Sequence, residues 1–417
     1  MNFAEAVAYL FGLGHEILTL KLGLRNTELL LETLDNPERA FPSVQIAGTN
    51  GKGSTAVMLD SICRAAGIRS GLYTSPHLVS ITERIRIAGP EISQADFARH
   101  TATVRDASHR LLASGQIEAL PTFFEQLTAI ALLAFREAEI ELAILETGMG
   151  GRLDSTTAAG AGVVAITPIA MDHEQYLGQT IDQIATEKAA IIRPGVKAII
   201  AKQQPEALSV LRQRCEETGV EPTRPDPPTI IDHRTDGRFC ISLPRYDRIC
   251  IGLRGRHQIE NALVAIRLAE SLSIPSQAIV EGIENAHHPG RLELSPPFLL
   301  DGAHNPAGAE ALRDYLNEFG RRPLTIVFGA MSDKKLDEIG AILFPLTDNL
   351  ILTEIDNPRT ASLATLQTIA TRFAPGSVTK FKSVAHAYQA ALRHPLREGL
   401  ICVTGSLYLL GEWKQIT

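Results

Sequence analysis

The segment Ile46-Ala-Gly-Thr-Asn-Gly-Lys-Gly-Ser-Thr55 sets the organisation of the chain. It follows a short apolar run, residues 44–46, and opens a helix-like segment that reaches Ala66. Glycines in such a turn let backbone N–H groups approach phosphate oxygens, the start of the helix adds positive potential, and Lys52 supplies a full charge. A strand, a glycine-rich turn and a helix in this order predict a phosphate-binding loop (P-loop), and hence nucleotide binding.

The match of this segment to the usual P-loop pattern, G-x-x-x-x-G-K-[ST], is incomplete. Ile46 stands where the first glycine is expected. Gly53 stands where a metal-binding hydroxyl is expected, and Ser54 comes one place later. The pattern by itself therefore leaves open a glycine-rich turn that binds no nucleotide.

The composition is that of an ordinary globular protein with two domains. At 417 residues the chain is long for one core, and 45% hydrophobic with 21% charged residues is typical of soluble proteins. Aromatic residues make up only 5% and the net charge is -7, so no nucleic-acid partner is expected. Residues 1–5 lack a basic region and no apolar run approaches about 18 residues, which predicts no signal peptide, no membrane span and a cytoplasmic location.

Five cysteines are scattered along the chain and never form a C-x-x-C pair: Cys63, Cys215, Cys240, Cys250 and Cys402. Cys240 and Cys250 could face each other on a hairpin. In a cytoplasmic protein, however, reduced structural thiols are the expectation.

Three expected strands in the first half of the chain end in polar residues. Strands over residues 68–74, 140–145 and 162–169 precede Ser75, Glu146 and Met171-Asp-His173, respectively. Ligands collect at the carboxyl ends of strands in an open parallel sheet, so Glu146 is well placed to hold a metal beside the P-loop, and His173 is a further polar group at the same edge. The alternatives are a turn residue at Ser75, a helix cap at Glu146 and a structural histidine at His173.

Two helix starts carry further candidates. Thr122 and Glu125 have the spacing of a capping box within Pro121-Thr-Phe-Phe-Glu-Gln126, where a cap followed by core aromatics is the alternative to a substrate wall. A helix that starts at Thr180 carries Lys188, which by itself would be a solvated surface lysine.

Two other segments have simple patterns. Residues 1–40 are expected to form two helices around the turn Lys21-Leu-Gly-Leu-Arg25. Residues 81–87 alternate as a strand with three charged residues at its solvent positions: Glu83, Arg84 and Arg86.

The second half adds a hairpin and a second α/β region. Residues 239–243 and 248–253 are typical of a β-hairpin. Residues 286–297 are rich in proline and resemble an interdomain linker. The residues after the linker alternate between strands and helices, with Asp301 after the first strand and Gly405-Ser-Leu-Tyr408 after the last.

We therefore predict an α/β fold with two domains. Residues 1–285 form an N-terminal P-loop domain with a doubly wound sheet and a small β excursion. Residues 286–297 form a hinge, and residues 298–417 form a C-terminal Rossmann-like α/β domain. Nucleotide and substrates would bind in the cleft between the domains, whose closure would exclude water.

Seven motifs follow one another along the chain: GTNGKGS, TSPHL, ETGMGGRLD, MDH, EKA, HPGRLE with DGAHNP, and TGSLYLLGE. Any one of them is common, but the ordered set is specific. Together they resemble the folylpolyglutamate synthase/dihydrofolate synthase family of the Mur ligase superfamily, from about Lys21 to Glu412.

This resemblance implies an ATP-dependent amide ligase. Such enzymes add L-glutamate to dihydropteroate, to the glutamate tail of tetrahydrofolates, or to both. The substrate carboxylate attacks the γ-phosphorus to give an acyl phosphate and ADP, and the glutamate amine then displaces phosphate. We accordingly expect ATP and Mg²⁺ at two sites as cofactors, folate or dihydropteroate and L-glutamate as substrates, and a monomer.

The resemblance also implies roles for individual residues. ATP contacts are implied for Gly51, Lys52, Gly53, Ser54, Asn261, Arg291 and Asp301. Mg²⁺ ligands are implied at Ser75, Glu146 and His173, with Ser75 supplying the hydroxyl that Gly53 lacks. Contacts to the pterin-bearing substrate are implied for Thr122, Phe123, Phe124, Glu125, Leu153, Asp154 and Ser155.

Three further implied residues concern catalysis and the incoming glutamate. Lys188, in the E-K-A motif, would be carboxylated at N6, which turns a cation into an anion beside the metal. With Lys52 and Lys188, His304 is a candidate catalytic residue. His304 and Ser406 would hold the incoming glutamate.

One departure and three other functions complete the sequence interpretation. Thr157 stands where the family often has Asn, which concerns the detail of the substrate loop. A Mur ligase of peptidoglycan precursors is disfavoured because GTNGKGS and HPGRLE suit the folate branch. A nucleotide-dependent switch or an inactive folate-binding module is disfavoured by four intact residues: Lys52, Glu146, His173 and Lys188.

Overall fold

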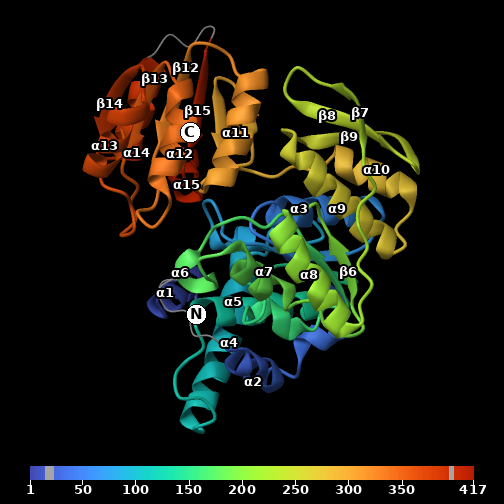
Figure 1. Ribbon diagram of the computed structural model, residues 1–417. Helices are drawn as coiled ribbons and strands as arrows, with labels where there is room; N and C mark the ends of the chain where they lie inside the picture. Colours follow the sequence, from blue (N-terminus) through green and yellow to red (C-terminus); the bar gives the residue numbers. More distant parts are fainter. Residues whose placement is uncertain (15–22, 394–398) are drawn as a thin grey trace. The chain divides into compact units, whose positions relative to one another are not determined.

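The computed structural model describes residues 1–14, 23–393 and 399–417 (Figure 1). By their internal contacts they divide into two units, both α/β, which confirms the predicted fold class. The first unit comprises Met1–Pro76, Ser80–Pro227 and Glu260–Asn285, and the second comprises His77–Val79, Pro228–Ile259 and Ala286–Thr417. The predicted domain boundaries stay predictions, although Pro228–Ile259, expected in the N-terminal domain, groups with the second unit.

Several helices in the first two thirds of the chain start at residues whose side chains cap the first turn. Thr122 accepts the N–H of Glu125 at the start of α5, and Thr180 accepts that of Gln183 at the start of α7. These helices are α1 (Phe3–Gly12), α2 (Arg25–Thr33), α3 (Lys52–Ala65), α4 (Gln94–Ala113), α5 (Phe123–Glu137), α6 (Glu174–Leu177), α7 (Ile181–Ala189), α8 (Pro205–Thr218), α9 (His257–Ser271) and α10 (Ser276–Glu284). Lys21 and Leu22 of the predicted turn lie outside the described residues.

The first sheet has six strands in the order β3-β2-β4-β1-β5-β6, all parallel except the edge strand β3. The strands are β1 (Ser43–Ala47), β2 (Ser70–Tyr73), β3 (Ile85–Ile87), β4 (Leu142–Glu146), β5 (Val163–Ile166) and β6 (Lys197–Ile200). The central strands are short, buried and mostly apolar, as expected of a parallel sheet covered on both faces. The carboxyl ends of β2, β4, β1 and β5 therefore meet at one edge.

Helices cover this sheet on its buried faces. Ala143 and Leu145 of β4 belong to the core with α4 and α5, whereas Val164 and Ile166 of β5 pack with α7 and α8. The P-loop helix α3 packs against α10 so closely that a Cβ on Gly282 would lie 2.3 Å from the Cα of Ile62. Within the described part of the chain, no helix is both long and apolar enough to span a membrane.

The prediction of one strand over residues 81–87 is wrong for its first half. Ser80 and Glu83 form a capping box that starts the 3₁₀ helix η2 (Ile81–Arg84), and only β3 is extended. Arg84 is 2% exposed and its guanidinium lies 5.4 Å from the centre of the Phe123 ring, so it does not occupy a solvent position. The capping interaction overrides the alternating pattern here.

The second unit contains a six-stranded sheet in the order β10-β11-β15-β12-β13-β14, with only β10 antiparallel. Its strands are β10 (Glu293–Ser295), β11 (Phe298–Asp301), β12 (Leu324–Phe328), β13 (Asn349–Thr353), β14 (Ser377–Phe381) and β15 (Leu400–Thr404). Helices α11 (Pro306–Phe319), α12 (Leu336–Leu343) and α13 (Leu363–Phe373) cover one face, and α14 (Val384–Arg393) and α15 (Leu407–Ile416) cover the other.

A separate antiparallel sheet of three strands also belongs to the second unit: β7 (Thr229–His233), β8 (Arg238–Leu243) and β9 (Tyr246–Arg254). It packs on α11, where the rings of Phe239 and Phe319 meet edge to face at 5.9 Å. The hydroxyl of Tyr315 donates to the carbonyl oxygen of Asp236 at 3.0 Å. The predicted hairpin is confirmed, and β7 is an additional strand.

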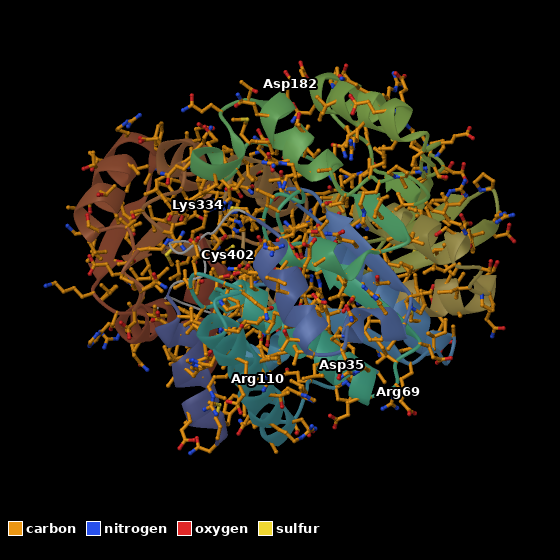
Figure 2. The ribbon with its side chains drawn as sticks, turned by 90° about the horizontal axis from the view of Figure 1, so that it is seen from below. Asp35, Arg69, Arg110, Asp182, Lys334 and Cys402 are labelled. Atoms are coloured by element: carbon orange, nitrogen blue, oxygen red, sulfur yellow. A yellow bond between two sulfur atoms is a disulfide. The ribbon has the colours of Figure 1, made fainter. Side chains whose placement is uncertain are left out.

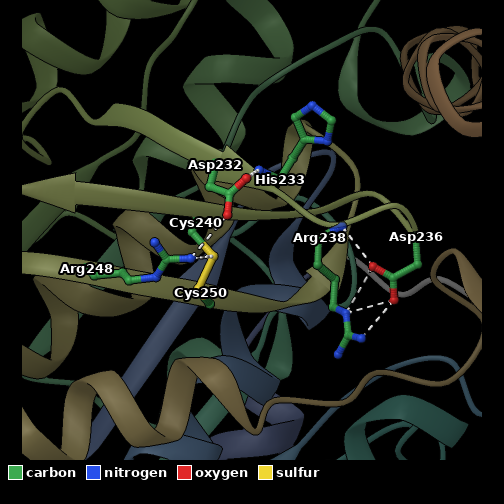
Figure 3. The surroundings of a disulfide bond; sticks show 7 residues. All are labelled: Asp232, His233, Asp236, Arg238, Cys240, Arg248 and Cys250. Atoms are coloured by element: carbon green, nitrogen blue, oxygen red, sulfur yellow. Dashed lines mark hydrogen bonds and ion pairs between the residues drawn. A yellow bond between two sulfur atoms is a disulfide. The ribbon is translucent and has the colours of Figure 1, made fainter.

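The expectation of reduced thiols is wrong for one pair of cysteines. Cys240 and Cys250 form a disulfide between β8 and β9 (Figure 3). Antiparallel pairing sets these two residues directly opposite each other, which brings their side chains together. The other three cysteines, Cys63, Cys215 and Cys402, are buried thiols. Cys402 lies inside the second unit (Figure 2). Charged side chains such as Asp35 and Arg69, in contrast, extend from the surface.

Candidate active site

The P-loop joins β1 to α3, and its shape depends on two glycines. Gly48 has a φ of 148°, and a Cβ there would lie 1.9 Å from the hydroxyl oxygen of Thr167. Gly51 has a φ of 87°, and a Cβ there would lie 2.1 Å from the side-chain oxygen of Asn261. No side chain fits at either position, so the loop is pressed between the end of β5 and helix α9.

The start of α3 offers the anion-binding surface that the sequence predicts. The N–H groups in the first turn of a helix have no intrahelical acceptor, and the helix dipole is positive there. In α3 this turn consists of Lys52, Gly53 and Ser54. Asn261, which is buried beside Gly51, is thereby brought next to the predicted phosphate ligands.

Two lysines approach the same carbonyl group of the P-loop. The Nζ atom of Lys52 donates to the carbonyl oxygens of Gly48 and Thr49, both at 3.2 Å. The Nζ atom of Lys188 donates to the oxygen of Gly48 at 2.9 Å, and Lys188 is only 4% exposed. Lys188 is therefore not a solvated surface lysine but part of the P-loop environment.

The pKa of Lys188 is lowered to about 7. Burial is the largest cause, and the positive charge of Lys52 acts in the same direction. The negative charges of Asp172 and Asp154 oppose the shift. Near neutral pH, Lys188 therefore titrates between ammonium and free amine.

We expect Lys188→Met to stabilise the protein at low pH. Lys188 has a pKa of about 7 in the folded protein and an ordinary value of 10.5. Below pH 7 the folded state bears the full cost of a buried ammonium, and this cost disappears between pH 7 and 10.5 because the folded state loses its proton first. The variant should exceed the wild type in free energy of unfolding by on the order of 3 kcal/mol at pH 6, with a gap that narrows as the pH rises.

Urea unfolding of both proteins in CO₂-free buffer, from pH 6 to pH 9.5, measures this gap. Buffer without CO₂ keeps the amine unmodified. A gap that is constant with pH, or a wild type that is the more stable protein at pH 6, contradicts the expectation.

Ser75 and Glu146 come from the ends of neighbouring parallel strands, β2 and β4. The carboxylate of Glu146 is 5% exposed and accepts the backbone N–H of Ser75 at 3.1 Å. Ile46 of β1 lies opposite Glu146 in the sheet, so the P-loop starts beside this carboxylate. The structure thus brings two of the predicted metal ligands together at the edge that carries the P-loop.

His173 and Asp172 follow β5 at the same edge of the sheet. His173 has a φ of 52°, and its backbone N–H donates to the carboxylate of Asp172 at 2.9 Å. The Nε2 atom of its ring lies 4.0 Å from the other oxygen of Asp172. Because Asp172 acts on the pKa of Lys188, we count it as a site residue, whereas the sequence interpretation assigned a role only to His173 of this group. The place of Asp172 at a strand end was the available signal.

A magnesium site here would depend on groups beyond the protein. Among the described residues, no three His, Cys, Asp or Glu side chains lie close enough to hold a metal ion. Magnesium in nucleotide sites is commonly bound by one or two carboxylates, with water and phosphate oxygens as the remaining ligands. The buried carboxylate of Glu146, beside Ser75, fits that pattern.

The loop after β4 carries three of the predicted substrate contacts. Asp154 is buried and accepts the N–H of Met149 at 2.9 Å, and burial raises the pKa of its carboxyl. The hydroxyl of Ser155 accepts that of Thr27 at 3.3 Å, while Leu153 is half-buried. The side chains of Asp154 and Ser155 therefore mainly form hydrogen bonds that stabilise the loop.

The predicted contacts in α5 divide into two groups. Thr122 and Glu125 form the capping box, and Phe123 is buried against Phe11 at 5.5 Å, so the alternative of a cap with core aromatics describes these three. The ring of Phe124 faces the β4 loop, where a Cβ on Gly148 would lie 2.6 Å from it. One carboxylate oxygen of Glu125, Oε1, is buried without a hydrogen-bond partner among the described residues, so it could accept one from a ligand.

Asp301 follows β11 in the second unit. Its buried carboxylate accepts the backbone N–H groups of Leu292 at 2.9 Å and Ala303 at 3.0 Å. Burial raises the pKa of this carboxyl, and the positive charge of Arg291 opposes the shift. Arg291 and Asp301 thus belong to one electrostatic cluster.

His304 and Ser406 lie at the ends of two neighbouring parallel strands, β11 and β15. The Nδ1 atom of His304 is 2.8 Å from the carbonyl oxygen of Gly302. Ser406 caps α15 by accepting the N–H of Tyr408 at 3.1 Å. The structure groups these residues with Asp301 in the second unit, whereas Asn261 lies in the first.

Two family models match the chain: the Mur ligase middle domain over residues 46–269, and the Mur ligase glutamate ligase domain over residues 290–407. A Halobacterium salinarum protein named probable bifunctional folylpolyglutamate synthase/dihydropteroate synthase is 34% identical over 423 residues, which cover 99% of this chain and 51% of that protein. The chain thus spans about half the length of this relative.

Two further comparisons cover most of both proteins. The dihydrofolate synthase/folylpolyglutamate synthase of Mycobacterium tuberculosis is 35% identical over 400 residues, covering 88% of this chain and 82% of that protein. The solved structure of Escherichia coli FolC in complex with DHPP and ADP is 30% identical, with a TM-score of 0.88 and coverage of 100% of this chain and 97% of that chain.

Proposed function

The chain belongs to the folylpolyglutamate synthase/dihydrofolate synthase family of Mur ligases, and on that basis we propose that it is an ATP-dependent amide ligase. It adds L-glutamate to dihydropteroate, to the glutamate tail of a reduced folate, or to both. The observation that carries the proposal is the approach of two lysines, Lys52 and Lys188, to one P-loop carbonyl beside the buried carboxylate of Glu146. The ADP bound to the Escherichia coli relative supports the use of ATP.

In this mechanism the protein orients the reactants and forms no covalent bond to them. The first turn of α3 and Lys52 hold the phosphates of ATP. The substrate carboxylate attacks the γ-phosphorus, ADP leaves, and the glutamate amine displaces phosphate from the acyl phosphate. Positioning and neutralisation of charge supply most of the catalysis in such a step. Cys63 is a poor nucleophile, because burial raises the pKa of its thiol to about 12.

Mg²⁺ would be held by Ser75, Glu146 and His173, with water and phosphate oxygens completing its coordination. When bound, it would neutralise charge on the transferring phosphate. The second unit would hold the incoming glutamate through His304 and Ser406. Arg291 and Asp301 would contribute to binding of the nucleotide. The monomeric state and the cytoplasmic location stay predictions.

The same proposal includes carboxylation of Lys188 at N6. Only the neutral amine reacts with CO₂, forming an N–C bond and releasing one proton, and a pKa of about 7 leaves much of Lys188 neutral at physiological pH. The product is an anion, so repulsion from Lys52 becomes attraction. Asp172 and Asp154 act against the anion, and the neighbouring cations of the site must outweigh them.

The fate of a heavy-oxygen label tests the proposed reaction. If the substrate carboxylate carries ¹⁸O, one labelled atom should appear in inorganic phosphate for each amide formed. An adenylate mechanism would place the label in AMP and release pyrophosphate. Label in AMP, or in neither product, refutes the acyl-phosphate route.

The requirement for co-substrates separates a ligase from a nucleotide-dependent switch. A ligase turns over ATP only with both a pteroyl substrate and glutamate, whereas a switch hydrolyses ATP without them. Assays with dihydropteroate and with tetrahydrofolate, run separately, distinguish the two ligase activities.

A further inference from the structure

Gln45 is fully buried in the middle of β1, three residues before the P-loop glycine Gly48. Its side-chain nitrogen Nε2 lies close to three threonine hydroxyl oxygens: Thr147 at 3.2 Å, Thr156 at 3.0 Å and Thr157 at 2.8 Å. Thr147 starts the loop that follows β4, and Thr156 and Thr157 end it. One amide thus connects both ends of the 147–157 loop to the central strand of the sheet.

The surrounding hydrogen bonds fix the direction of this amide. The hydroxyl of Thr156 donates its proton to the carboxylate of Asp154, and that of Thr157 donates to the carbonyl oxygen of Gly151 at 2.7 Å. Both hydroxyls can therefore only accept from Gln45, so an N–H group must face them. The amide oxygen Oε1, on the other side, is buried without a hydrogen-bond partner among the described residues.

The same loop meets the rest of the site along its length. Asp154 accepts the N–H of Met149 and acts on the pKa of Lys188. A Cβ on Gly151 would lie 2.8 Å from the carbonyl oxygen of Glu187, so the loop packs directly against the end of α7. A shift of the loop would consequently change the position of Asp154 relative to Lys188. It would also change the contact between Gly148 and the ring of Phe124.

We propose that Gln45 is a positioning residue that holds the 147–157 loop in the shape that the pteroyl-bearing substrate requires. The proposal rests on the proposed function for the identity of the substrate, but the network itself is independent of it. Thr157, where the family often has Asn, is one of the three anchors of this network.

Hydrogen exchange of the ligand-free protein tests the anchoring directly. Gln45→Met keeps the length of the side chain but removes its N–H groups. Amides of peptides within residues 147–160 should exchange at least about tenfold faster than in the wild type, with little change elsewhere in the first unit. Gln45→Glu should have an effect at least as large at pH 8, since a carboxylate would face hydroxyls whose protons are donated elsewhere.

Steady-state kinetics test the consequence for the substrate. In Gln45→Met the KM for the pteroyl substrate should rise by about tenfold, with the KM for ATP and kcat changed by less than about threefold. Equal losses in kcat for every substrate, without faster exchange in the loop, would indicate a general defect and overturn the proposal. If the wild type shows no ligase activity the proposed function fails, yet the exchange result still decides the role of Gln45.

Two sets of variants serve as controls. Thr101→Val removes another buried hydroxyl of the first unit, which donates to the carbonyl oxygen of Phe97 within α4, and should leave loop exchange and kinetics unchanged. Thr157→Val should accelerate hydrogen exchange in the loop. Thr157→Ser retains the hydroxyl, so its loop amides should exchange as slowly as in the wild type. If Gln45→Met fails to fold, the Thr157 pair decides: equal exchange in both variants overturns the proposal.

Discussion

Lys52→Ala is expected to lower the rate of ADP formation by about a thousandfold. Lys52 is the charged group of the P-loop. Its Nζ atom is held at the N-terminus of α3 by hydrogen bonds to two P-loop carbonyl oxygens. The thermal midpoint of unfolding should change by less than about 4 °C, because the side chain is half-buried and its loss also removes the repulsion on Lys188. Coupled measurement of ADP release and a thermal melt on the same preparation provide both quantities.

Lys197→Ala is a suitable control for this variant. Lys197 is an exposed lysine of the same unit, whose Nζ atom donates to the carbonyl oxygen of Ser271. Its replacement should leave ADP formation unchanged. A Lys52→Ala protein that keeps a tenth or more of wild-type activity would contradict the phosphate-binding role of the loop.

Lys188→Ala is expected to reduce turnover by about a hundredfold or more. The physical reason is the loss of the anion that the carboxylated lysine would place beside the P-loop and the metal. Short carboxylic acids such as acetate should restore part of the activity, since truncation to alanine leaves room for a small anion. The measurement is kcat as a function of acetate and bicarbonate concentration.

Lys188→Met separates chemical rescue from a general salt effect. The longer apolar side chain fills the space, so acetate should fail to restore this variant. Equal rescue of both variants, or an unmodified Lys188 in a crystal grown with bicarbonate, would contradict the carboxylation. The acyl-phosphate route is tested separately, by the ¹⁸O-labelling experiment.

Much of the first unit could be predicted because its elements depend on local signals. Buried parallel strands appear as apolar runs, and polar residues directly after them mark one edge of the sheet. For this reason Ser75 and Glu146, more than 70 residues apart in the chain, could be placed at one edge of the sheet, and their hydrogen bond shows that they meet there. Helix caps such as Thr122 and Thr180 were equally local and were predicted correctly.

The missed features depend on contacts between distant segments or lack an apolar pattern. β7 is exposed along its whole length, so it lacks the buried run that identifies a strand. The disulfide required the register of β8 against β9, and composition alone favoured free thiols. Gln45 looked like an ordinary strand residue, because its three threonine partners lie about 100 residues or more further along the chain.

The discontinuous first unit has a consequence for synthesis on the ribosome. Its last segment, Glu260–Asn285, supplies Asn261, which lies against Gly51, and α10, which covers Ile62 of the P-loop helix. The ribosome must therefore translate Pro228–Ile259, which belong to the other unit, before the unit that contains the P-loop can close its own core. A nascent chain released after Pro227 would contain every predicted phosphate and metal ligand of the sheet edge, yet one side of α3 would remain uncovered. The proposed nucleotide site is therefore completed late in translation, although its signature motif is among the first segments to emerge.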